Sequence, residues 1–245
     1  MSRAALAAVT EPFMDYFLLL GVLGGALAVD DKAGWQSLLA QPIFAALLVG
    51  LLFGQIAAGL MIGLFLELIW LAVLPMRGMK RPDQVCGAIV GASAACYLIH
   101  ETGDPRFTFV VALGVLIGLF AGEFAARASV PLFKVRERRL ARVGAYGKMD
   151  GWQPMRSILW IHIFATAYIF LVEMMIVLVS LLIAGVFARW VSSSAGSLAI
   201  RAIENWGLIL PAFGVSSLVH VFWHKHLTRF LILSGLLALF ILWIK

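Results

Sequence analysis

A 35-residue stretch, Pro42 to Met76, contains no Lys, Arg or Asp and limits the possible folds more than any other part of the chain. Backbone groups find no hydrogen-bonding partners in lipid, so a membrane-crossing segment is normally a helix of about 20 mostly apolar residues. The stretch is too long for one ordinary span, and it contains a natural breaking point at Gly54 and Gln55. We therefore predict two helices of unequal length, at about 42–54 and 56–75, with the first too short to cross a bilayer alone.

The overall composition extends this interpretation to the whole chain. Apolar and aromatic residues make up 62% of the sequence and charged residues only 13%, which a soluble domain would not show. We predict an all-α, polytopic membrane protein with about six to eight transmembrane or re-entrant helices. The other expected helices lie at about 12–29, 85–99, 107–126, 158–187, 205–223 and 227–244.

The formal charge of +6 comes mostly from one segment, Lys134 to Arg156, between two apolar blocks. Positive residues collect in the cytoplasmic loops of membrane proteins, so this pattern indicates a cytoplasmic loop rather than a nucleic-acid-binding surface. We expect an N-terminal membrane half at 1–126 with short or re-entrant segments. A basic cytoplasmic linker at 127–156 and a C-terminal membrane half at 157–245 would follow, all within one membrane domain.

Glu67 lies near the middle of the predicted 56–75 helix, among apolar neighbours. A charged residue at a helix centre costs roughly 2.5 to 3.5 kcal/mol on membrane-insertion scales, so such residues usually face a cavity or a partner. The functional interpretation is a position on a substrate pathway. The structural alternative is a hydrogen bond between helices.

Polar residues between the short segments form a second candidate site that includes Arg77 and Asp83. The plain alternative is a surface loop whose cations reach the membrane interface. His162 and Glu173 share one face of a predicted helix but are about 16 Å apart, so each must find any polar partner on another helix.

Metal binding and enzymatic chemistry have little support in the sequence. His220 and His224 have a spacing that would allow one metal to be shared, but no carboxylate or cysteine accompanies them. We expect no catalytic residue, no metal and no cofactor. Glycines at 114, 118 and 122, and at 50, 54, 59 and 63, have the spacing of closely packed membrane helices.

Four short motifs follow one another in the first half of the chain: Gln41–Ile43, Gly59–Gly63, Leu66–Leu71 and Pro82–Asp83. They resemble the IIC membrane subunit of the mannose/fructose/sorbose class of bacterial sugar phosphotransferase systems. Their order and spacing match that family most clearly from residue 41 to 92, and a later Ile158–His162 stretch is also similar.

The resemblance implies a sugar-translocating subunit in the bacterial inner membrane that works with a IID membrane partner. Cytosolic IIA and IIB proteins would relay phosphate from phosphoenolpyruvate to the sugar, so this chain would not be phosphorylated. Glu67 and Asp83 would lie at or near the sugar path, where carboxylates accept hydrogen bonds from hydroxyl groups. Arg77 and His162 complete the predicted substrate-binding set.

The sequence departs from the family pattern in a turn that is normally small and neutral. Arg77–Arg81 places bulk and positive charge there, and Gln55 replaces an expected Asp. These changes leave open an alternative, a divergent, non-transporting paralogue that acts as a membrane scaffold or sensor for phosphotransferase proteins.

Overall fold

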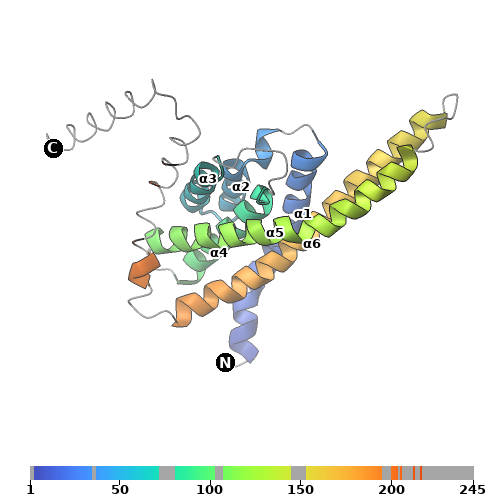
Figure 1. Cartoon of the computed structure of the whole chain (residues 1–245). Coiled ribbons are helices and arrows are strands. Elements are labelled where there is room, and N and C mark those ends of the chain that lie inside the picture. The colour runs from blue at the N-terminus through green and yellow to red at the C-terminus, as the bar shows by residue number, and fades with distance from the viewer. Residues whose placement is uncertain are drawn as a thin grey trace, which may run out of the picture.

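The computed structural model describes residues 3–34, 37–71, 81–102, 107–144, 153–194 and 200–203, together with residues 205, 212 and 216. Every regular element within these residues is helical, which confirms the all-α prediction (Figure 1). The elements are α1 (Arg3–Lys32), the short 3-10 helix η1 (Leu38–Ala40), α2 (Pro42–Leu52), α3 (Ile56–Trp70), α4 (Gln84–Thr102), α5 (Phe107–Gly144) and α6 (Gln153–Ser194).

Helices α2 and α3 form a hairpin whose turn lies where the sequence predicted it. Gly54 has a φ of 67°, a left-handed conformation that glycine adopts without the steric cost of a side chain. At 1.5 Å per residue, α2 is about 16 Å long and α3 about 22 Å. Neither helix reaches the roughly 30 Å thickness of the hydrocarbon core, so neither is long enough to cross a bilayer alone.

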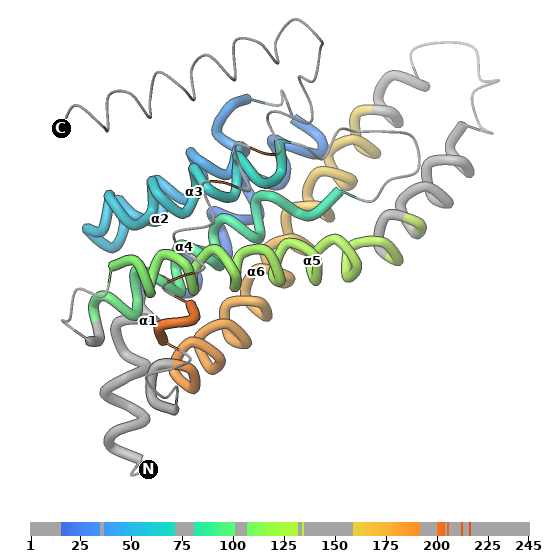
Figure 2. The backbone as a smooth tube through the Cα atoms, turned by 60° about the vertical axis from the view of Figure 1, so that its left-hand side comes forward, coloured from blue at the N-terminus to red at the C-terminus, as the bar shows by residue number. Residues whose placement is uncertain are grey.

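Helix α4 is the centre of the bundle and is buried from Val85 to Leu98. It packs closely against α5 because glycines remove the side chains between the two backbones. A Cβ atom at Gly91 would lie 2.5 Å from the Gly114 carbonyl oxygen, and one at Gly87 would lie 2.6 Å from that of Gly118. The predicted packing role of the glycines on α5 is therefore confirmed (Figure 2).

Helices α5 and α6 lie side by side and continue beyond the other helices (Figure 1). Two segments, Phe107–Pro131 and Leu159–Val191, are long and apolar enough to cross a membrane. The helices themselves are longer than the predicted 107–126 and 158–187. Beyond its apolar span, α5 continues through a segment that contains Arg, Glu and Leu, which are good helix formers. Much of the predicted linker at 127–156 is thus helical.

Helix α1 crosses α6 and completes the described bundle. Gly21 and Gly24 lie against Leu178 and Val177 of α6, and both contacts are too close for a larger residue. The helix begins at Arg3, earlier than the predicted residue 12, and ends at Lys32. Arg77, His220, His224 and most of the predicted C-terminal helical pair lie outside the described residues.

Candidate binding site at the helix ends

Polar groups meet where α1 ends and α4 begins, about halfway along the two long apolar segments. Asp83, immediately before α4, donates its backbone N–H to the Gly122 carbonyl of α5 at 2.9 Å. Gly122 lies near the middle of Phe107–Pro131, and Glu173 lies near the middle of Leu159–Val191. The start of α4 is therefore near the middle of the membrane-spanning part of the bundle.

Lys32, at the end of α1, joins two carboxylates from different helices. Its Nζ lies 2.5 Å from Asp83 Oδ2 and 2.6 Å from Glu173 Oε1. The Asp83 and Glu173 side chains are 4% and 2% exposed, whereas that of Lys32 is 17% exposed. We call these three residues the ion cluster. It ties α1, α4 and α6 together at one depth.

Asp83 also stabilises the first turn of α4. Its Oδ1 accepts a hydrogen bond from the Cys86 N–H at 2.9 Å, which satisfies a backbone donor that has no partner inside the helix. The partial positive charge at a helix N-terminus favours an ionised carboxylate in this position. Both oxygens of Asp83 are thus occupied by contacts within the protein.

Glu67 has a different environment from the ion cluster. Its side chain on α3 is half-buried, and Oε2 accepts only a long hydrogen bond, 3.5 Å, from the Ile43 N–H. Ile43 belongs to the first turn of α2, so the carboxylate lies at the positive end of that helix. One face of Glu67 remains able to accept hydrogen bonds from a ligand.

The structure brings together some of the predicted site residues and separates others. Lys32 joins Asp83 to Glu173, whereas the His162 side chain is exposed on α6, about 16 Å from Glu173 along the helix axis. The expectation that Glu173 meets a polar group on another helix is confirmed, because Lys32 contacts it. Arg77 lies outside the described residues.

Lys32 is the functional candidate that the sequence analysis missed. It follows Asp30 and Asp31 at the end of an apolar block, which looks like an ordinary polar boundary. A usable signal was the presence of Glu173 in a long apolar helix, because a buried carboxylate requires a cation or hydrogen-bond donors. Within the described part of the chain, no three His, Cys, Asp or Glu side chains converge to hold a metal.

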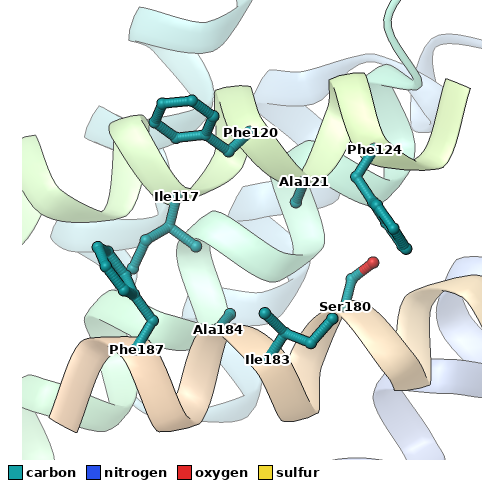
Figure 3. Close-up of a pocket in the computed structure, with 8 residues that line it drawn as sticks. All are labelled: Ile117, Phe120, Ala121, Phe124, Ser180, Ile183, Ala184 and Phe187. Carbon is teal, nitrogen blue, oxygen red and sulfur yellow. The ribbon is translucent and has the colours of Figure 1, made fainter. Parts of the chain in front are cut away.

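A cavity of about 400 Å³ lies between α5 and α6 (Figure 3). The Ser180 hydroxyl is the polar side-chain group among its lining residues, and it also accepts a hydrogen bond from the Cys86 thiol across 3.7 Å. Such a lining suits hydrocarbon better than a sugar, which needs several hydrogen-bonding groups. The lining residues are Ile117, Phe120, Ala121, Phe124, Ser180, Ile183, Ala184 and Phe187.

Comparisons with known proteins agree with this architecture. Residues 16–243 match the family model described as "PTS system sorbose-specific iic component". A 76-residue segment, 31% of this chain, is 36% identical to the "Putative N-acetylgalactosamine permease IIC component 2" of Escherichia coli (strain K12). The matched segment spans 56% of that relative's length. Because the family model covers most of the chain, this protein belongs to the family of sorbose-specific IIC components of phosphotransferase systems.

Proposed function

We propose that this chain is the sugar-translocating IIC subunit of a phosphoenolpyruvate-dependent phosphotransferase system of the mannose/fructose/sorbose class. The observation that carries the proposal is the meeting of the end of α1, the start of α4 and two carboxylates halfway along the long apolar segments. Interrupted helices at mid-depth supply free backbone groups and helix dipoles, which are the usual materials of a transporter's substrate site.

Glu67 is the residue to which we assign direct contact with sugar. Its carboxylate has one long hydrogen bond within the protein and is half-exposed, so it keeps the capacity to accept hydrogen bonds from hydroxyl groups. Asp83 would act near the sugar path by fixing the start of α4, since both of its oxygens have partners in the protein. Arg77 and His162 stay in the proposal as further substrate-binding residues on the basis of sequence.

The proposed partners follow from the division of labour in such systems. A IID membrane subunit would complete the permease, and cytosolic IIA and IIB proteins would carry the phosphoryl group. The bacterial inner membrane is the proposed location. This chain would bind and move the sugar, and it would leave phosphoryl transfer to its partners.

The scaffold alternative has one structural observation in its favour. Helices α5 and α6 extend past the bundle, and α5 carries basic residues from Lys134 to Arg142 along that extension (Figure 1). A non-transporting paralogue would use this surface to recruit cytosolic phosphotransferase proteins. It would then lose recruitment, rather than uptake, when Lys134 to Arg142 are neutralised.

The test is phosphoenolpyruvate-dependent uptake of labelled hexoses and amino sugars, including N-acetylgalactosamine, in cells that express this chain with IID and IIAB partners. Glu67→Gln should reduce uptake of the transported sugar while the membrane complex still assembles. Glu123→Gln is the matched control, because Glu123 pairs with Arg127 on the exposed surface of α5. Failure to take up any sugar, with the complex shown to be assembled, would favour the scaffold.

A further inference from the structure

The ion cluster has an unbalanced charge in a buried place. Asp83 and Glu173 would together carry two negative charges when ionised, whereas the Lys32 ammonium that contacts both carries one positive charge. An uncompensated charge away from water is costly, and the usual response of a buried carboxylate is to become neutral by taking up a proton. The arrangement therefore favours a form in which one of the two carboxyl groups is protonated.

Within the described residues, the surrounding charged groups do not remove this imbalance. Asp31 of α1 and Arg81, just before α4, are both exposed and carry opposite charges, and Asp31 adds its negative charge near Lys32 and Asp83. The groups that face the buried carboxyls from α4 and α6 include the Cys86 thiol and the Ser180 hydroxyl, which are paired with each other. From α5, the group nearest Asp83 is the neutral Gly122 carbonyl.

The hydrogen bonds distinguish the two carboxyl groups. Asp83 accepts from both Lys32 and the Cys86 N–H, and the positive end of α4 stabilises its negative charge. Glu173 lies in the middle of α6, away from any helix end, and accepts from Lys32 through Oε1. A negative charge is therefore stabilised less on Glu173 than on Asp83, and Glu173 is the carboxyl group that the proton favours.

From this geometry we infer that the ion cluster is a proton-binding site within the membrane, with one proton carried by Glu173. The proton makes the cluster electrically neutral and lets α1, α4 and α6 pack together around it. A movement that separates these helices and admits water would release the proton, because water would then solvate the free charges. The inference does not depend on which ligand the protein transports.

The test compares the infrared spectrum of the purified wild-type protein with those of its variants, in detergent and without sugar or partner subunits. The wild type should show the carbonyl stretching band of a protonated carboxylic acid that resists exchange with bulk water. Glu173→Gln should abolish the contribution of this group to the band. Asp83→Asn should abolish it as well, because Lys32 and an ionised Glu173 then form a balanced pair, and asparagine can still cap α4.

Two further measurements keep the test decisive. Glu123→Gln should leave the band unchanged, because Glu123 lies in an exposed ion pair with Arg127. If one cluster variant fails to fold, as judged by gel filtration and thermal stability, the other variant still tests the same proton. A wild-type spectrum without the band, or a band that survives in both folded variants, would overturn the inference.

Discussion

Glu173 and Glu67 are both carboxylates in apolar helices, but the structure gives them different surroundings. Glu173 is 2% exposed and contacts a cation, whereas Glu67 is half-exposed and accepts one long backbone hydrogen bond. The first ties α1, α4 and α6 together, and the second lies at the open end of the α2–α3 hairpin. A carboxylate in an apolar helix can thus either bind a ligand or hold helices together, and its hydrogen-bond partners within the protein distinguish the two roles.

The strongest challenge to this comparison is Lys32→Met, which leaves Asp83 and Glu173 without the cation that contacts both. Removing one partner of a buried ion pair costs about 3 kcal/mol or more, so we expect a large loss of thermal stability or of folded protein. Fluorescence-detected gel filtration during heating measures this effect. Lys134→Met, at an exposed position, should behave like the wild type.

A charge-balanced triple variant sharpens the same prediction. Lys32→Met combined with Asp83→Asn and Glu173→Gln removes all three ionisable groups while keeping side chains of similar size. We expect this variant to recover most of the stability lost in Lys32→Met, because no unpaired buried charge remains. A triple variant as unstable as the single one would show that Lys32 stabilises the bundle by packing rather than by charge.

A smaller effect is expected from Gly59→Ala in the α2–α3 hairpin. A Cβ atom at this position would lie 2.5 Å from the Ala46 carbonyl oxygen, so α2 and α3 would have to move apart. Overpacking of this kind costs about 2 kcal/mol. Thermal unfolding measures the loss, and sugar uptake should fall with it because the hairpin positions Glu67. Normal stability would contradict the close contact.

A substitution in the turn of the same hairpin should cost less stability than Gly59→Ala. Gly54→Ala introduces a side chain at φ 67°, where nothing lies within 4 Å of the new Cβ atom. The cost is then only that of a left-handed backbone conformation, about 1 kcal/mol. Thermal unfolding beside Gly59→Ala should give this order, and the reverse order would show that the turn rather than the helix contact controls the hairpin.

The hairpin was predictable from sequence and the ion cluster was not. The absence of Lys, Arg and Asp over 42–76 together with Gly54 predicts two short helices, because length and turn chemistry are local properties. The contacts of Lys32 join residues 51 and 141 positions apart, so no local pattern reveals them. The long end of α5 was missed for another reason: hydropathy marks the edge of the membrane, and a helix that contains Arg, Glu and Leu continues beyond it.

Glu67→Gln should have the smallest effect on stability and a large effect on transport. The amide keeps the size of the side chain and an oxygen that can accept the long hydrogen bond from Ile43, so thermal stability should change by less than about 0.5 kcal/mol. Uptake should nevertheless fall about tenfold or more, because hydrogen bonds from sugar hydroxyls to a charged acceptor are stronger than those to an amide. Parallel measurements of uptake and unfolding separate the two effects. A stable variant with unchanged uptake would remove Glu67 from the sugar path, whereas a destabilised one would make it a structural carboxylate like Glu173.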